Sequence, residues 1–136
     1  MARYRSVCLV VAFLSAVLLG TVGCRGAAEA GCPAQITPAE LAGRVSTPAA
    51  PLILDVRSPR EYAAGHVPGA INIPHNQLAS RLGELGIDKS DELVVYCLSG
   101  QRAAMAEQVL AQAGYTSVCG LEGQLRAWHG GGYPIE

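Results

Sequence analysis

The stretch VVYCLSGQRAA, Val94–Ala104, decides the fold class of this chain. Leu93–Tyr96 is a run of β-branched and bulky apolar residues, which is typical of a strand buried on both faces. Ser99–Gly100 interrupts that pattern, and Arg102–Ala113 then predicts a helix. Cys97 therefore lies where a buried strand ends and a helix is about to begin.

This position favours a reactive thiolate at Cys97. Backbone N–H groups of the loop and the positive end of the following helix stabilise negative charge, and Arg102 adds a cation. Such surroundings make a cysteine nucleophilic at physiological pH. The alternative is an inert cysteine that only ends a buried strand, because free cysteine is among the most buried residue types.

The rest of the chain alternates between predicted strands and helices. Further strands are expected at Leu52–Val56, Ala70–Ile73 and Tyr115–Val118. Further helices are expected from Thr37 to about Val45, from Ser58 to Gly65, at Asn76–Leu85 and at Glu122–Trp128, and the helix after Cys97 should bury Met105, Val109 and Leu110. This alternation predicts an α/β fold with a mainly parallel sheet covered on both faces, and ligands bind such sheets at the carboxyl ends of the strands.

Two of these helix starts carry the same capping chemistry. Thr37-Pro38-Ala39-Glu40 and Ser58-Pro59-Arg60-Glu61 each place a hydroxyl at the N-cap, proline at the first helical position and glutamate at the third. Capping alone accounts for Glu61 at this stage.

The first two dozen residues differ in character from the rest. Arg3 and Arg5 precede an uncharged apolar run, Val7–Leu19, which suits the core of a signal peptide and is short for a membrane span. Thr21–Cys24 resembles the end of a bacterial lipoprotein signal, where cleavage frees Cys24 for lipid attachment. Plain secretion and an uncleaved anchor are the alternatives. All three place the domain outside the cytoplasm, on the periplasmic or cell-surface side, and the first anchors it to the membrane by lipid.

We therefore expect a lipoprotein-type signal peptide at 1–23, a tether at 24–35 and one domain at 36–136, with room for a modest core. Once Arg3 and Arg5 are removed, eight basic residues face eleven acidic ones, a net charge of −3. This balance does not suggest a nucleic-acid partner, and we expect a monomer.

The cysteines divide into groups with different expected roles. Cys8 lies in the apolar run and Cys24 is the lipidation candidate, which leaves Cys32, Cys97 and Cys119. Three thiols cannot all pair, so an oxidising compartment predicts one disulfide and one free cysteine, and pairing Cys32 with Cys119 would leave Cys97 free. The chain has no CxxC motif and no Cys/His cluster of zinc spacing, so neither a metal site nor another cofactor is predicted.

Three segments together resemble the rhodanese family. LDVRSPREYAAGHVPGAINIP, Leu54–Pro74, is similar to the N-terminal signature of rhodanese domains, and the Cys97 loop is similar to the family's active-site loop. The C-terminal signature is matched by Leu121–Gly123, Trp128 and Gly132–Pro134. The resemblance covers about residues 37–136 and implies a three-layer α/β domain, with a central, mainly parallel five-stranded sheet and helices on both faces.

The resemblance also implies a thiosulfate sulfurtransferase-like enzyme. Cys97 would take a sulfane sulfur from a donor such as thiosulfate or a persulfide, and would pass it to cyanide or a thiol. The loop around the terminal sulfur, which would bind the substrate through backbone N–H groups, consists of Leu98, Ser99, Gly100, Gln101 and Arg102. Related phosphatases use a larger loop, so this cradle suits one sulfur better than a phosphate.

Three polar residues of the N-terminal signature are candidates for supporting roles. Arg57 is predicted to bind an anionic donor, and Asp55 and His66 to support the loop. Their alternatives are structural: an ion pair between Asp55 and Arg57, or bonds to loop backbone, and a histidine that only fixes its own loop.

Two residues depart from the family pattern. Leu98 stands where many rhodaneses have arginine, which removes a positive charge from the entrance. Because thiosulfate is a dianion, this change should raise its KM more than that of a neutral persulfide donor. Gln124 stands where a second glycine is common, a change expected to affect entry into the helix more than the chemistry.

Two other functions fit the same residues. A non-catalytic rhodanese-fold module would carry sulfur or bind a protein partner, and it predicts no multiple turnover with small donors. A thiol-redox or arsenate-reducing enzyme predicts that Cys119 or Cys32 comes within disulfide distance of Cys97.

Overall fold

The computed structural model describes residues 32–136, so the expected signal peptide, Cys24 and most of the tether lie outside the described residues. Within them, five parallel strands form one sheet in the order β1-β5-β4-β2-β3. The strands are β1 (Gln35–Ile36), β2 (Leu52–Asp55), β3 (Ile71–Asn72), β4 (Leu93–Tyr96) and β5 (Val118–Leu121). The predicted α/β fold with a parallel five-stranded sheet is confirmed.

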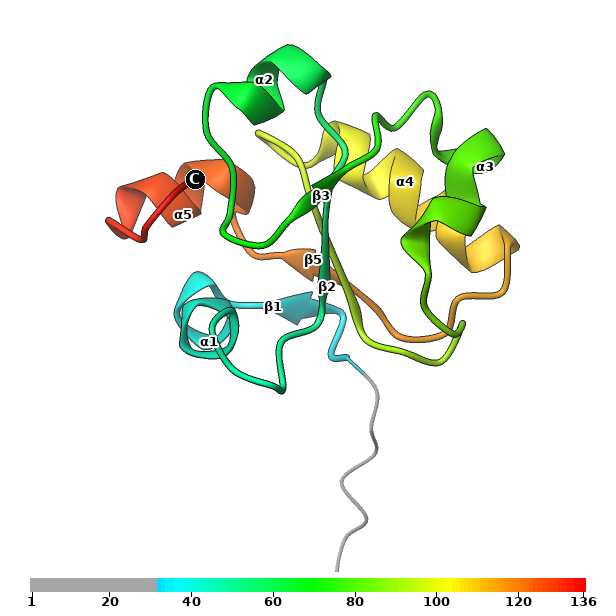
Figure 1. Ribbon diagram of the computed structural model, residues 1–136, viewed down its shortest axis with the longest axis horizontal. Coiled ribbons are helices and arrows are strands. Elements are labelled where there is room, and N and C mark those ends of the chain that lie inside the picture. The colour runs from blue at the N-terminus through cyan, green and yellow to red at the C-terminus, as the bar shows by residue number, and fades with distance from the viewer. Residues whose placement is uncertain (1–31) are drawn as a thin grey trace, which may run out of the picture.

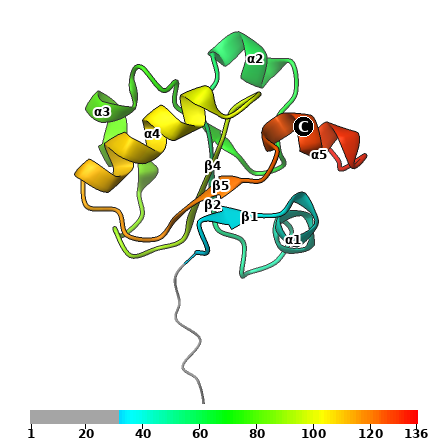
Figure 2. The same ribbon diagram turned by 180° about the vertical axis from the view of Figure 1, so that it is seen from behind.

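Helices cover both faces of this sheet (Figures 1 and 2). They are α1 (Pro38–Arg44), α2 (Pro59–Ala63), α3 (Leu78–Arg81), the 3-10 helix η1 (Leu82–Leu85), α4 (Gln101–Gln112) and α5 (Gln124–Gly130). Helices α1 and α5 lie on one face, α3 and α4 on the other, and α2 lies beyond the carboxyl ends of the strands. No helix in the described part of the chain is long and apolar enough to cross a membrane.

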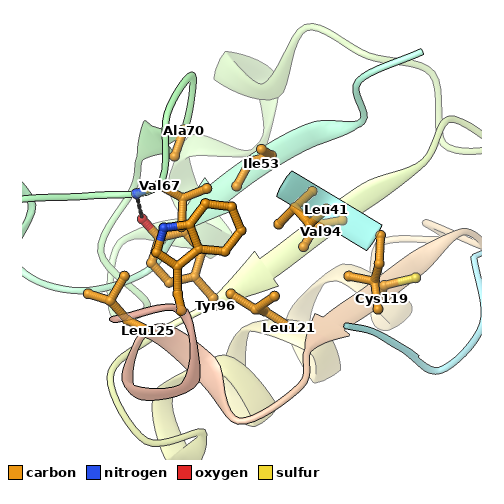
Figure 3. Close-up of a cluster of buried hydrophobic side chains, with 11 residues drawn as sticks. Leu41, Ile53, Val67, Ala70, Val94, Tyr96, Cys119, Leu121 and Leu125 are labelled. Atoms are coloured by element: carbon orange, nitrogen blue, oxygen red, sulfur yellow. Dashed lines mark hydrogen bonds between the residues drawn. The ribbon is translucent and has the colours of Figure 1, made fainter. Parts of the chain in front are cut away.

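Each face of the sheet has its own hydrophobic cluster. Trp128 of α5 belongs to the cluster that also contains Leu125 of α5, Leu41 of α1 and Tyr96. Figure 3 shows Leu125, Leu41 and Tyr96 among the buried side chains of this cluster. On the other face, alanines and Leu110 of α4 pack with Leu78 of α3. The Trp128 indole is completely buried and donates a hydrogen bond of 2.8 Å to the Pro134 carbonyl, which fixes the C-terminal segment against the core.

Both predicted capping boxes are present. The hydroxyls of Thr37 and Ser58 accept hydrogen bonds from the backbone N–H groups of Glu40 and Glu61, and the two glutamates accept the N-cap N–H groups in return. These reciprocal bonds satisfy donors that the first turn of a helix leaves free. Helices α1 and α2 therefore begin where the sequence predicts.

Three predicted segments have other bounds in the structure. The helix expected at Glu122–Trp128 runs over Gln124–Gly130, because Gly123 is its N-cap. The strand expected at Tyr115–Val118 begins only at Val118, because the Tyr115 N–H bonds the Leu110 carbonyl and the Thr116 N–H bonds the Lys89 carbonyl, so neither residue is paired with β4. The helix expected at Asn76–Leu85 is a short α-helix that tightens into η1.

The predicted buried face of α4 is partly wrong. Met105 is 49% exposed, and the buried positions are Ala103, Ala106 and Leu110, with Val109 partly buried. The buried residues Ala103, Ala106 and Leu110 follow the spacing i, i+3, i+7, and Met105 lies off that stripe.

A disulfide joins Cys32 to Cys119 of β5, with the two Cα atoms 5.6 Å apart. Among the described residues Cys97 is the free cysteine. The pairing considered from the sequence is therefore confirmed. The two cysteines are 87 positions apart in the sequence, so the bond encloses nearly the whole domain.

Candidate active site

The predicted site residues meet at the carboxyl ends of the central strands. Asp55 ends β2 and is in register with Tyr96, which ends the neighbouring β4. Arg57 and Cys97 follow directly on these two strands, and Gln124 begins α5 shortly after β5. Parallel pairing therefore brings together three loops that are far apart in sequence.

The Cys97 thiol lies beneath its own loop. It is 1% exposed, and its Sγ accepts a hydrogen bond of 3.0 Å from the Gly100 N–H. Gly100 has φ of +107°, a conformation that glycine adopts without the Cβ penalty of other residues. The first N–H groups of α4 follow immediately and have no partners within the helix. The loop thus brings the Gly100 N–H to the sulfur. Substrate binding by the backbone of Leu98–Arg102 stays a prediction.

Arg102 forms a two-pronged ion pair with Glu61 across the entrance. Its Nη1 and Nη2 lie 2.7 and 2.8 Å from the two carboxylate oxygens of Glu61. The hydrogen bonds from Arg102 lower the pKa of Glu61, and those from Glu61 raise the pKa of Arg102, to which the nearby Cys97 sulfur also contributes. Sequence reasoning explained Glu61 by capping alone and missed this pair, because the partners are 41 residues apart.

Asp55 and Arg57 form a buried ion pair. Arg57 Nε lies 2.9 Å from Asp55 Oδ2, its Nη2 donates to the Gly65 carbonyl, and Tyr96 Oη donates to Asp55. The side chains of Arg57 and Asp55 are 5% and 0% exposed. Burial, the largest single influence, lowers the pKa of Arg57, but the hydrogen bonds to Asp55 and the negative charges of Asp55 and Glu61 together raise it, and the net shift is upward. This is the structural alternative considered from the sequence; a role of Arg57 in donor binding stays a prediction.

Gln124 contacts the backbone of Cys97. Its Oε1 accepts the Cys97 N–H at 2.8 Å, and its Nε2 donates to the Leu121 carbonyl at 2.7 Å. It is the one non-glycine residue of the described segment with positive φ, +60°, a conformation that costs an ordinary residue roughly 1–2 kcal/mol. The sequence-based expectation that this departure concerns helix entry more than chemistry is therefore incomplete. The sequence signal for this contact was a polar residue at a position where the family commonly has glycine.

A family model described as Rhodanese-like domain matches residues 37–130. The chain belongs to this family.

Named relatives of this rhodanese domain include sulfurtransferases. The chain is 39% identical over 84 residues to the "Sulfurtransferase" of Allochromatium vinosum, covering 62% of this chain and 77% of that protein. It is 42% identical over 65 residues to the "Thiosulfate sulfurtransferase PspE" of Escherichia coli, covering 48% of this chain. That alignment spans 62% of the length of PspE.

A solved rhodanese-like structure shares the fold. The crystal structure of the Alr3790 protein from Anabaena superposes with a TM-score of 0.68 at 33% sequence identity. The match covers 74% of this chain and 81% of that one.

His66 holds a loop of this rhodanese domain. Its ring stacks on Tyr62 with centroids 3.7 Å apart, and its Nδ1 lies 3.1 Å from the Tyr62 carbonyl. Its backbone N–H and carbonyl both bond Glu136. These contacts match the loop-fixing alternative and connect the N-terminal signature to the C-terminus.

A pocket of about 240 Å³ lies next to the Cys97 loop, and Arg102 belongs to both. Its lining residues are Ser58, Pro59, Pro74, His75, Asn76, Gln77 and Arg102. The sequence assigned no role to His75, Asn76 or Gln77.

Neither of the other two cysteines in residues 32–136, Cys32 and Cys119, lies beside Cys97, as a redox mechanism would require. Cys119 belongs to the hydrophobic cluster under α1 and α5, while Cys97 belongs to the cluster under α3 and α4. Cys119 is bonded to Cys32, and Glu92 lies within 4.8 Å of both sulfurs. This arrangement removes the feature that the redox or arsenate-reducing alternative predicts.

Proposed function

We propose that this chain is a sulfurtransferase in which Cys97 carries the sulfane sulfur as a persulfide. The observation that carries the proposal is the hydrogen bond from the Gly100 N–H to Cys97 Sγ, at the point where β4 ends and α4 begins. That donor and the free N–H groups of the helix stabilise a thiolate before the reaction and a persulfide anion after it. Membership in the rhodanese-like family and the names of the relatives support the same activity.

The reaction consists of two displacements. The Cys97 thiolate attacks the outer sulfur of the donor, a new S–S bond forms, and the donor's own S–S bond breaks, so that thiosulfate leaves as sulfite with the electron pair. The acceptor, cyanide or a thiolate, then attacks the outer sulfur of the persulfide and leaves as thiocyanate or a new persulfide. Cys97 returns to the thiolate, and no general base is needed for this exchange.

The charges around the loop favour an organic persulfide over thiosulfate as the donor. Leu98 replaces a cation, Arg102 is paired with Glu61, and Arg57 is paired with Asp55. Each paired arginine offers less net positive charge to a dianion than a free one would. The adjoining pocket offers room for the organic part of such a donor or for a thiol acceptor.

We place this activity outside the cytoplasm, with the domain held at a membrane through a lipid on Cys24. The apolar run at Val7–Leu19 and the lipoprotein-like Thr21–Cys24 motivate this part of the proposal. The Cys32–Cys119 disulfide supports an oxidising compartment. Radiolabelled palmitate incorporation into the wild type, compared with Cys24→Ser, tests it; equal labelling would contradict lipid attachment at Cys24.

Intact-mass spectrometry with peptide mapping tests the chemistry. The purified protein and its Cys97→Ser variant are exposed to thiosulfate or to an organic persulfide, and then to cyanide. We expect the wild type alone to gain one sulfur, about 32 Da, on the Cys97 peptide and to lose it as thiocyanate appears. The Cys32–Cys119 peptide, which retains its disulfide, serves as the internal control.

The result also separates the alternatives. If neither donor loads sulfur onto Cys97, the sulfurtransferase proposal is wrong and a protein-binding module is the better interpretation. If sulfur is loaded once but small acceptors do not release it over repeated cycles, the domain is a sulfur carrier.

A further inference from the structure

We propose that Gln124 is a positioning residue for Cys97. Its side-chain carbonyl and the adjacent Leu125 N–H hold the two peptide planes that flank Cys97, and so direct the thiol toward the Gly100 N–H. The effect on sulfur transfer rests on the proposed function; the effect on thiol reactivity does not.

The backbone of Cys97 is held from both sides by one short segment. Gln124 Oε1 accepts the Cys97 N–H at 2.8 Å, and the Leu125 N–H donates to the Cys97 carbonyl at 3.1 Å. The N–H belongs to the peptide plane before Cys97 and the carbonyl to the plane after it. The rotations of these planes about Cα are φ and ψ, so fixing both planes fixes the direction of the Cα–Cβ bond.

Both polar atoms of the Gln124 amide are hydrogen-bonded in this arrangement. Its Nε2 donates to the Leu121 carbonyl at the end of β5, while its Oε1 reaches the end of β4. The side chain therefore ties together the ends of two adjacent strands, and its own orientation is set by the donor that it offers to Leu121. Gln124 is also buried, which excludes water as an easy substitute for either bond.

The side chain also packs beneath the loop. A Cβ added at Gly100 would lie 3.8 Å from Gln124 Cγ, so the residue that donates to the sulfur is in near contact with Gln124. Contacts with both ends of the loop, the Cys97 N–H and Gly100, are made by one residue.

The backbone conformation of Gln124 indicates that glutamine, and not glycine, occupies this position because of its side chain. Gln124 has φ of +60°, and glycine would take that conformation without penalty. A glycine, however, could not accept the Cys97 N–H. The strain is compensated by two buried hydrogen bonds, one of which acts on the nucleophile.

Two substitutions separate the side chain from the backbone strain. Gln124→Met keeps the length and the positive φ but removes the acceptor. Gln124→Gly removes the acceptor and relieves the strain. Gln108→Met changes an exposed glutamine in the middle of α4 and is the matched control.

The first readout is the pH profile of Cys97 alkylation by iodoacetamide, measured with the Cys32–Cys119 disulfide intact. The second is the steady-state kinetics of sulfur transfer, with kcat and KM measured separately. Thermal unfolding reports the stability of each variant.

We expect both Gln124 variants to move the midpoint of the alkylation profile upward by roughly half a pH unit or more, because the thiolate loses well-placed donors. We expect kcat to fall about three- to tenfold with little change in KM. Gln108→Met should match the wild type. Thermal stability should fall for Gln124→Met but less, or not at all, for Gln124→Gly.

An unshifted alkylation profile in both Gln124 variants would overturn the inference, as would wild-type reactivity in Gln124→Gly alone, since strain and not the acceptor would then matter. A wild type that alkylates normally but transfers no sulfur from any donor would overturn the proposed function instead, and the alkylation profiles would still decide the role of Gln124.

Discussion

Helices α1 and α2 begin with the same capping motif, but their glutamates have different partners: Glu40 bonds within its own cap, whereas Glu61 also pairs with Arg102. In both, the N-cap hydroxyl accepts the N–H of the third helical residue, at 3.2 Å for Thr37 and 3.3 Å for Ser58. Hydrogen bonds from Thr37 are the main cause of the lowered pKa of Glu40, whereas Arg102 is the main cause for Glu61. The α2 motif lies at the carboxyl edge of the sheet, so its glutamate can serve the helix and the Cys97 loop together.

The largest expected effect comes from removing Arg102, the arginine that pairs with Glu61 of α2. Arg102→Ala takes a cation away from the Cys97 sulfur and leaves Glu61 unpaired beside it, so sulfur loading from thiosulfate should slow by about tenfold or more. The measurement is the rate of the 32 Da mass gain, about one sulfur atom, at fixed thiosulfate.

The matched control is Arg44→Ala in α1. Arg44 pairs with Glu92, and the side-chain exposures of that pair, 32% and 28%, are close to the 28% and 34% of Arg102 and Glu61. Loading by Arg44→Ala should stay close to that of the wild type. Equal slowing in both variants would mean that lost stability, and not charge at the loop, is responsible.

A smaller, opposite effect is expected when the carboxylates are neutralised. Glutamine at the third helical position preserves a capping box, so Glu61→Gln and Glu40→Gln both keep their helix starts. Glu61→Gln should release the charge of Arg102 and lower the KM for thiosulfate by about three- to tenfold, with less change for a neutral persulfide. Glu40→Gln should change neither KM.

Steady-state kinetics at low and high salt check this expectation. Because salt screens exposed charges, the gain of Glu61→Gln with thiosulfate should shrink at high ionic strength. A gain that is independent of salt, or one that appears equally with a neutral donor, would point to a change in shape and not in charge.

The two N-cap hydroxyls should contribute equally to the free energy of unfolding. Ser58→Ala and Thr37→Ala should each lower the free energy of unfolding by about 1 kcal/mol, because each leaves one helical N–H without its partner. Urea unfolding provides the comparison. A much larger loss for Ser58→Ala would show that the α2 cap also supports the loop structurally.

The smallest effect is on the pH dependence of stability. The folded-state pKa of Glu61 is depressed, first by Arg102, so its contribution to stability is present above the unfolded pKa of about 4.3 and is lost as pH falls toward the folded value. The difference in unfolding free energy between the wild type and Glu61→Gln should therefore shrink on acidification below about pH 4. A difference that is constant with pH would exclude the ion pair as its source.

Short-range features of this domain could be predicted from the sequence. A capping box is complete within four residues, and the run Leu93–Tyr96 identifies a central strand without knowledge of its neighbours. The position of Cys97 at a strand end followed by a helix is equally local. For these features the determining atoms are adjacent in the chain.

Features that depend on the register of separate strands could not be predicted. The reach of Gln124 to Cys97 spans 27 residues, and its length requirement is visible only once β4 and β5 are paired. Met105 was misplaced because both Met105 and the alanines Ala103 and Ala106 lie at helical spacing from Val109 or Leu110, and only contact with the sheet shows which stripe is buried. Arg102 was assigned to the loop from its position in the sequence. The neutralisation of its charge by Glu61 depends on where α2 lies at the carboxyl edge of the sheet.

The disulfide gives the domain a mechanical property as well as a thermodynamic one. Strand β1 is a two-residue edge strand, and a pull on the chain ahead of it would otherwise peel it from the sheet one bond at a time. Cys32 precedes β1 and is bonded to Cys119 in β5, which is paired on both sides, by β1 and by β4. Force arriving through residues ahead of Cys32 is therefore carried by the covalent bond into an interior strand. The Cys97 loop follows the carboxyl end of β4, whereas Cys119 lies near the start of β5, so the loop is away from the point where the force enters the sheet.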